Sequence, residues 1–136
     1  GISCFRINEV GAGFIDGQGN QLFGKVWEGT GVFSEGLAAV RKNNLVGYID
    51  TKGNEVIPCQ FATGGAFTGG ITGFKQTNEG LWGIIKKDGT VLLSPQFTTV
   101  TQTIGYLYAV TFPDEALGYI NNKGEIVWRG SRPFVK

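Results

Sequence analysis

The chain has 136 residues, which is the size of a single domain with a core of its own, so we expect residues 1–136 to form one domain. Its 12 basic and 11 acidic residues leave a net charge of +1 without a basic stripe or an acidic block, which argues against binding to nucleic acid or to an anionic membrane surface. No apolar run approaches the ~18 residues that a membrane-spanning helix needs, and no signal peptide is visible, so we expect no membrane span.

Glycine occurs throughout the chain, so that few stretches are long enough for a helix. There are 23 glycines, more than twice the usual share of ~7%, and they lie among aromatic and β-branched residues rather than in a low-complexity tract. The longest stretch without Gly or Pro, from Leu37 to Val46, is ten residues long and contains Asn43-Asn44, a pair typical of turns. We therefore expect an all-β protein.

A seven-residue pattern that begins and ends with glycine occurs four times. The copies span residues 13–19, 47–53, 83–89 and 118–124, and their first glycines are 34, 36 and 35 residues apart. Self-similarity at a fixed period of this size indicates a repeat architecture. The chain then divides into four tandem units of about 35 residues, at about 1–35, 36–69, 70–104 and 105–136.

Each unit is predicted to form a three-stranded antiparallel meander. The first strands are expected at residues 2–6, 37–41, 71–75 and 107–111, where large and small apolar residues mix as in strands covered on both faces. The second strand lies in the repeated pattern and ends in a turn, in which Gly19, Gly53, Gly89 and Gly124 are expected at positive φ. The third strand follows directly and is expected to stop at Pro58 and at Pro95.

Two arrangements of the four units agree with this pattern. An elongated array, in which each unit packs on its neighbours, is favoured because the first and last units are the least regular, as terminal units of arrays usually are. A compact four-bladed, propeller-like ring is the alternative, and it alone requires contact between the first and last units.

Segments of the second unit resemble the bacterial WG-repeat (KWG) family. The resemblance rests on residues 33–40, 47–53 and 56–61, and the Trp-Gly pair of the family occurs once, as Trp82-Gly83. The other units have Ala12, Val46 and Leu117 at the tryptophan position. The resemblance implies bacterial origin, a β-rich tandem array and a binding or interaction role, and it brings no catalytic residues to transfer.

The residue types available do not favour catalysis, a metal or a cofactor. Histidine is absent, which removes the commonest general base and most transition-metal sites. Asp16 and Asp50 hold equivalent places, but Lys86 and Asn121 replace them in the other units, so a repeated calcium site is not expected. The glycine clusters at residues 11–13 and 69–70 do not precede a predicted helix, so we interpret them as strand or turn positions rather than phosphate loops.

The two cysteines, Cys4 and Cys59, are too few for a disulfide scaffold. We expect both to be small buried residues. A single disulfide and a reactive thiol remain as alternatives, and the cellular compartment stays open.

Residues that break the repeat are the candidates for a binding surface. Trp27-Glu28 and Trp128-Arg129 combine an aromatic residue with a charge, a combination common in interface hot spots, whereas Trp82 is expected in the core. Alternatively, Trp27 and Trp128 fill gaps in the end units.

The loop between the first two strands of the last unit contains Phe112, Asp114 and Glu115 beside a proline. An exposed phenylalanine next to two acids would suit a protein partner. A phenylalanine folded back onto its own hairpin is the alternative.

We expect a non-enzymatic module that binds a protein, of the inhibitor, immunity or scaffold type. The alternative is a carbohydrate or cell-wall binder that stacks sugars on Trp27, Trp128 and tyrosines. Such a binder needs exposed aromatics in phase with the repeat, whereas Trp27 corresponds to Phe61, Phe97 and Arg132, a pattern more typical of a core position.

Overall fold

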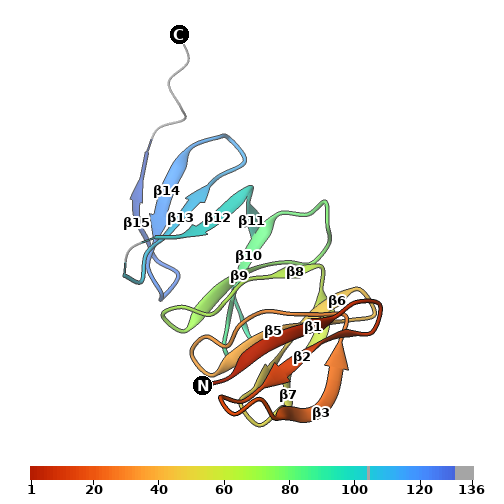
Figure 1. The fold of residues 1–136 in the computed structure, drawn as a ribbon. Coiled ribbons are helices and arrows are strands. Elements are labelled where there is room, and N and C mark those ends of the chain that lie inside the picture. Colours follow the sequence, from red (N-terminus) through yellow and green to blue (C-terminus); the bar gives the residue numbers. More distant parts are fainter. Residues whose placement is uncertain (104, 131–136) are drawn as a thin grey trace.

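The computed structural model describes residues 1–103 and 105–130. These residues form fifteen strands and no helix, arranged as antiparallel sheets that follow one another along the chain (Figure 1). More than half of the described residues lie in strands. The prediction of an all-β repeat protein is confirmed, and Arg132 and the rest of residues 131–136 of the last unit lie outside the described residues.

The first sheet has three strands and each later sheet has four. The first sheet consists of β1 (Ser3–Ile7), β2 (Gly11–Ile15) and β3 (Gln21–Trp27). The second sheet consists of β4 (Gly29–Thr30), β5 (Leu37–Lys42), β6 (Leu45–Asp50) and β7 (Glu55–Phe61). The third sheet consists of β8 (Thr63–Gly64), β9 (Ile71–Lys75), β10 (Trp82–Lys86) and β11 (Val91–Phe97). The last sheet consists of β12 (Thr99–Gln102), β13 (Tyr108–Thr111), β14 (Leu117–Ile120) and β15 (Ile126–Arg129).

The fourth strand of the later sheets extends the predicted meander. The strands β4, β8 and β12 come from the end of the preceding sequence unit and pair antiparallel with β5, β9 and β13. Each sheet therefore takes its first edge strand from residues that the sequence assigned to the unit before it. This exchange ties consecutive units together through backbone hydrogen bonds.

The sheets form an open stack in chain order. Three clusters of buried side chains lie between the first and second, the second and third, and the third and last sheets. Among the described residues no cluster joins the first sheet to the last one, and the two lie at opposite ends of the molecule (Figure 1). The elongated array is therefore the observed architecture, and the propeller-like ring is not.

An internal sheet is buried on both faces because its side chains alternate between two clusters. We call the face turned toward the following sheet the trailing face and the opposite one the leading face. In β6, Val46 and Tyr48 lie on the trailing face in the cluster shared with the third sheet, whereas Ile49 lies on the leading face against the first sheet. The prediction that the first strands are covered on both faces is confirmed in β5 and β9 and is wrong for β1, which is mostly exposed.

The first glycine of the repeated pattern marks a close backbone approach. A Cβ built on Gly47 would lie 2.5 Å from the Ile57 oxygen, and one on Gly83 would lie 2.7 Å from the Leu93 oxygen. No real Cβ tolerates such contacts with backbone, so only glycine fits. The glycine clusters interpreted as strand or turn positions behave in the same way: a Cβ on Gly11 would lie 2.5 Å from the Trp27 oxygen, and Gly69 and Gly70 have φ of 67° and 88°.

The prediction that Pro58 and Pro95 end the third strands is wrong. The strands β7 and β11 continue past these prolines to Phe61 and Phe97. Both are edge strands, and both have a bulge at this point: Val46 pairs with Phe61 whereas Tyr48 pairs with Ile57. A proline in a bulge of an edge strand removes no ladder hydrogen bond.

The turn of the repeated pattern has the predicted conformation. Gly19, Gly53, Gly89 and Gly124 have φ of 87°, 86°, 89° and 82°. Asp50 Oδ1 accepts hydrogen bonds from Lys52 N and Asn54 N at 2.9 Å, and Asp16 does the same for Gln18 N and Asn20 N. These backbone N–H groups lower the pKa of both carboxyls.

The turn glycines allow a matched test of backbone strain and steric contact. We expect Gly19→Ala to lower the free energy of unfolding by about 1 kcal/mol, because the φ disfavours a Cβ while no atom lies within 4 Å of it. Gly53→Ala should cost more, because its Cβ would lie 2.5 Å from Phe23 Cδ1. Urea denaturation of both variants measures the difference. Equal losses would contradict the steric contribution, and no loss in either would contradict the turn.

The turn aspartates predict a loss of stability in acid. Because folding lowers their pKa, the stabilisation is complete above the unfolded pKa of about 4 and disappears as the pH falls through the folded pKa. The double variant Asp16→Asn, Asp50→Asn should therefore lose less melting temperature than the parent between about pH 5 and about pH 2. Asparagine keeps the turn, since Asn121 Oδ1 accepts from Lys123 N and Glu125 N. Parallel melting curves would refute this account.

Candidate functional site

Five of the seven residues predicted for binding come together in the last sheet. Phe112, Asp114 and Glu115 lie in the loop between β13 and β14, and Trp128 and Arg129 lie in β15. The Arg129 guanidinium contacts Asp114 Oδ2 at 3.0 Å and lies 3.7 Å from the centre of the Phe112 ring. These charges are thus partnered within the sheet, and the pair lies on the surface.

Phe112 does not project into solvent. Its side chain is 6% exposed and packs edge-on against Phe97, with ring centres 5.5 Å apart. It also covers Gly118, where an added Cβ would lie 2.7 Å from the ring. The loop phenylalanine is folded back onto its own hairpin, so we remove it from the candidate surface.

Trp27 and Glu28 have structural environments at the opposite end of the stack. Trp27 is 8% exposed and packs against Phe14 in the first core cluster. The carboxylate of Glu28 accepts hydrogen bonds from Asn43 N at 2.8 Å and Asn44 N at 2.9 Å, which holds the turn between β5 and β6. The predicted residues therefore do not form one surface.

Trp128 is exposed and belongs to a larger apolar face. It is 52% exposed and packs against Tyr119 on the neighbouring strand, with ring centres 6.0 Å apart. Strand pairing and alternation place further side chains on this trailing face of the last sheet. We call it the open trailing face, and its side chains are Thr99, Thr101, Ala109, Thr111, Leu117, Tyr119 and Trp128.

The open trailing face differs from the same face of the internal sheets in being uncovered. Leu117 and Tyr119 are 53% and 38% exposed, whereas Val46 and Tyr48, at the same places in the second sheet, are 5% and 0% exposed. The sequence analysis missed Leu117 and Tyr119. The alignment of the repeats could have found them, because it places them at positions that are buried between sheets elsewhere.

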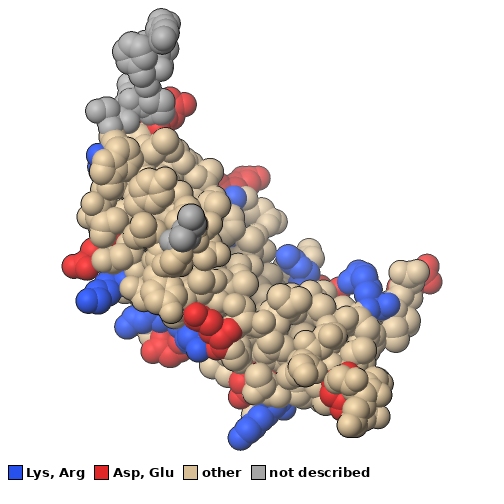
Figure 2. Space-filling model, turned by 60° about the vertical axis from the view of Figure 1, so that its left-hand side comes forward, with Lys and Arg blue, Asp and Glu red and all other residues tan. Residues whose placement is uncertain are grey.

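The open trailing face contains a shallow groove of about 440 Å³. Its lining includes three threonines beside the apolar side chains, and Thr99 Oγ1 donates to Thr111 Oγ1 at 2.8 Å. No Lys, Arg, Asp or Glu lines it. Figure 2 shows a broad surface without charged side chains over the part of the molecule that holds the last sheet. Such a surface suits an apolar or aromatic partner and offers no general base.

A family model described as WG containing repeat matches residues 13–45, 47–79 and 82–102, well over half of the chain. The chain belongs to the WG containing repeat family. No curated protein matches it in a sequence comparison. Bacterial origin stays a prediction. The strands β14 and β15, which contribute Leu117, Tyr119 and Trp128 to the open trailing face, lie outside the matched residues.

The defining tryptophan of the WG repeat is only partly in the core. Trp82 is half-buried and packs on the cluster between the third and last sheets, and Lys75 Nζ lies 5.5 Å from its ring centre. The prediction of a core position is confirmed in part, because Trp82 packs against the core cluster but is not fully buried.

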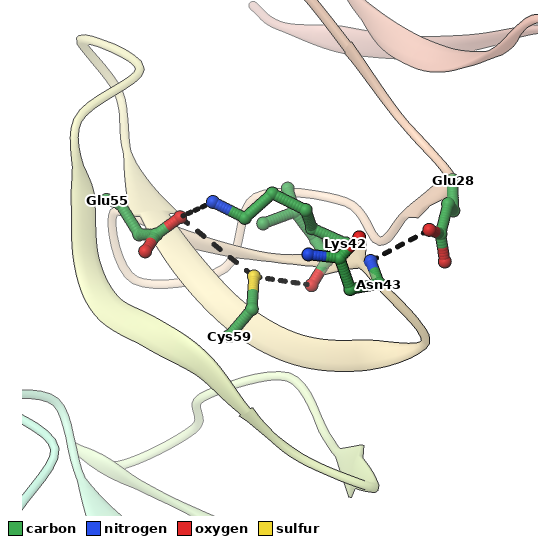
Figure 3. A network of polar contacts seen from close by, with 6 residues as sticks. Glu28, Lys42, Asn43, Glu55 and Cys59 are labelled. Carbon is green, nitrogen blue, oxygen red and sulfur yellow. Dashed lines mark hydrogen bonds and ion pairs between the residues drawn. The ribbon is translucent and has the colours of Figure 1, made fainter.

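The cysteines of this WG-repeat protein have different environments, and both are free. Cys4 is exposed because β1 is an edge strand that no short fourth strand flanks, so the expectation that it is buried is wrong. Cys59 is half-buried, with Sγ 3.9 Å from the Val40 oxygen and 4.0 Å from Glu55 Oε1 (Figure 3). Burial and the Glu55 charge raise the pKa of Cys59, which disfavours the thiolate.

Within residues 1–103 and 105–130, no three His, Cys, Asp or Glu side chains gather in a way that could hold a metal ion. The same part of the chain contains no helix that is long and apolar enough to cross a membrane.

The two thiols should differ in reactivity. We expect iodoacetamide at neutral pH to alkylate the exposed Cys4 at least about tenfold faster than Cys59, whose raised pKa and burial reduce the reactive thiolate. Quenched labelling followed by peptide mass spectrometry gives both rates. The denatured chain is the control and should show similar rates at the two sites; faster labelling of Cys59 in the folded protein would contradict its environment.

Proposed function

We propose that this WG-repeat protein is a non-enzymatic protein-binding module and that it binds through the open trailing face of its last sheet. One observation carries the proposal. Side chains of the same kind, at the same places of the repeat, are buried against a neighbouring sheet in the interior of the stack and are accessible on the last sheet. A contiguous accessible apolar face of this sort marks an interaction surface in a monomeric protein.

The open trailing face is composed of residue types that contribute strongly to binding affinity. Trp128 and Tyr119 are large, stiff aromatic side chains, the residue types that most often act as hot spots. Leu117 extends the apolar surface beside them, and the threonine hydroxyls can satisfy polar groups at its margin. No charged group has to be desolvated when a partner covers the groove.

A binding role rather than catalysis is supported by the side chains at hand. The chain has no histidine, the groove is lined by neither carboxylate nor amine, and the partly buried Cys59 has a raised pKa. The near-neutral net charge of +1 favours a protein over a nucleic acid as partner. An inhibitor, an immunity-type protein and a scaffold all use a rigid surface of this kind.

Carbohydrate or cell-wall binding is the second candidate. Its support is the aromatic pair Tyr119 and Trp128 beside threonine hydroxyls on one face. The support is limited to the last sheet, because Trp27, Phe61 and Phe97, which recur in phase, are all buried. A repeated sugar platform along the stack is therefore not favoured.

The proposal predicts that one charge on the face abolishes partner capture. Proteins retained from the native host by the immobilised parent are compared with those retained by Leu117→Glu. The control variant is Val91→Glu, because Val91 is 50% exposed on the edge strand of the third sheet. We expect at least one protein to bind the parent and Val91→Glu but to be reduced at least about tenfold on Leu117→Glu.

The comparison separates the possible outcomes. The same proteins at the same levels on all three baits would contradict the proposed surface. Retention of the parent on immobilised cell-wall glycan that Leu117→Glu abolishes would favour the carbohydrate candidate instead. Circular dichroism of each variant verifies that the sheets remain folded.

A further inference from the structure

We propose that the open trailing face binds the leading face of the first sheet in a second copy of this chain, so that copies stack head to tail. This inference rests on the proposed function and names the partner of the same surface. It is supported by the packing within the molecule, where the trailing face of one sheet packs on the leading face of the next at each junction along the chain.

The internal junctions show what covers a trailing face. Between the second and third sheets, Tyr48 and Phe61 on the trailing face meet Phe74 on the leading face of the next sheet. The rings of Phe61 and Phe74 lie 5.0 Å apart, and the Tyr48 hydroxyl donates to the Gly65 oxygen at 2.6 Å. Each trailing face is thus complementary to a leading face, and no junction within the described residues pairs two trailing faces.

The first sheet presents a leading face of the same construction. Its side chains are Ser3, Phe5, Ile7 and Ile15, which alternation and strand pairing place together. We call it the open leading face. The Phe5 ring lies over Gly13, where a Cβ would be 2.9 Å from Cζ, just as the Phe74 ring lies over Gly83 at 2.7 Å.

Phe5 therefore holds the place on the first sheet that Phe74 holds on the third, but no other sheet covers it. Phe74 is 1% exposed, whereas Phe5 is half-buried and Ile7 beside it is 47% exposed. Covering Phe5 and Ile7 would give the first sheet the same two-sided burial as the second and third.

The two open faces match in chemistry as well as in construction. The side chains named for the two faces include no Lys, Arg, Asp or Glu, so contact between them desolvates no full charge. One offers Tyr119 and Trp128, and the other offers Phe5; aromatic rings also meet across the junction between the second and third sheets and across that between the third and last sheets. The open faces lie on the first and last sheets, at opposite ends of the stack (Figure 1), so association at one end leaves the other end free. Such a heterologous contact continues beyond a dimer.

Sedimentation of the parent and of two end-blocked variants tests this arrangement. Leu117→Glu places a charge on the open trailing face and Ile7→Glu places one on the open leading face, both at positions about half exposed. The average mass of the parent should rise more than about twofold, past that of a dimer, as its concentration increases from about 1 μM to about 1 mM. Each variant alone should stay a monomer, while an equimolar mixture of the two should form a dimer and stop there, because the two faces left uncovered in that dimer both carry the added glutamate.

Every other result overturns the inference. A parent that stays monomeric throughout would do so, as would Leu117→Glu that assembles like the parent. Self-association of Ile7→Glu alone would show that two trailing faces meet instead. Val91→Glu is the matched control and should assemble like the parent, and Thr101→Arg with Ser3→Arg replaces the first pair if either glutamate variant unfolds. Capture of a different host protein that depends on Leu117, together with a monomeric parent, would leave the proposed function standing and this inference refuted.

Discussion

Each internal sheet of this protein has to be buried on both faces, and this constraint determines the composition of its strands. In the central parts of β5 and β6 the apolar side chains enter one of two cores, and the polar residues lie at the strand ends and turns. Small residues are required where backbone comes close, as at Gly47 beneath the bulge of β7. The aromatic rings that cover Gly83 and Gly118 then fill the space that each missing Cβ leaves. At Gly83 and Gly118 the glycine and the aromatic ring above it therefore depend on each other for close packing.

Within the described residues, the first and last sheets of the stack each have one face that no other sheet covers. Apolar side chains recur at the repeat positions whether or not another sheet follows, so the last sheet carries Leu117 and Tyr119 where the second carries Val46 and Tyr48. Leaving such side chains in water has a free-energy cost of about 25 cal/mol per Å² of apolar surface, which a partner with a similar face can offset. The binding surface is thus a consequence of the architecture. Trp128, which packs on Tyr119, adds an aromatic side chain from a strand that the family model does not match.

Rigidity of the stack supports this role. Two acidic side chains hold turns of the next sheet by accepting hydrogen bonds from backbone N–H groups: Glu28 binds the turn at Asn43 and Asn44, and Glu35 binds Gly69 N and Gly70 N at 2.8 Å. The Lys42–Glu55 ion pair at 3.2 Å joins β5 to β7 across the intervening strand β6 of the second sheet (Figure 3). The last sheet is tied to the third by the Tyr108 hydroxyl, which donates to the Ile71 oxygen at 2.9 Å, and a face held in this way loses little conformational entropy on binding.

The sequence by itself determined the number of units, the near absence of helix and the positions of β5 and β9. It also determined that the turn glycines have positive φ, because steric limits on φ act within a few residues. Only the tertiary structure decided which aromatic residues are buried. Trp27, Phe112 and Trp128 were all candidates for the binding surface, yet the first two lie in cores and the third is exposed, since burial depends on which sheet lies opposite. The paths of β7 and β11 through Pro58 and Pro95 were likewise decided by edge position and bulges, which no local pattern reveals.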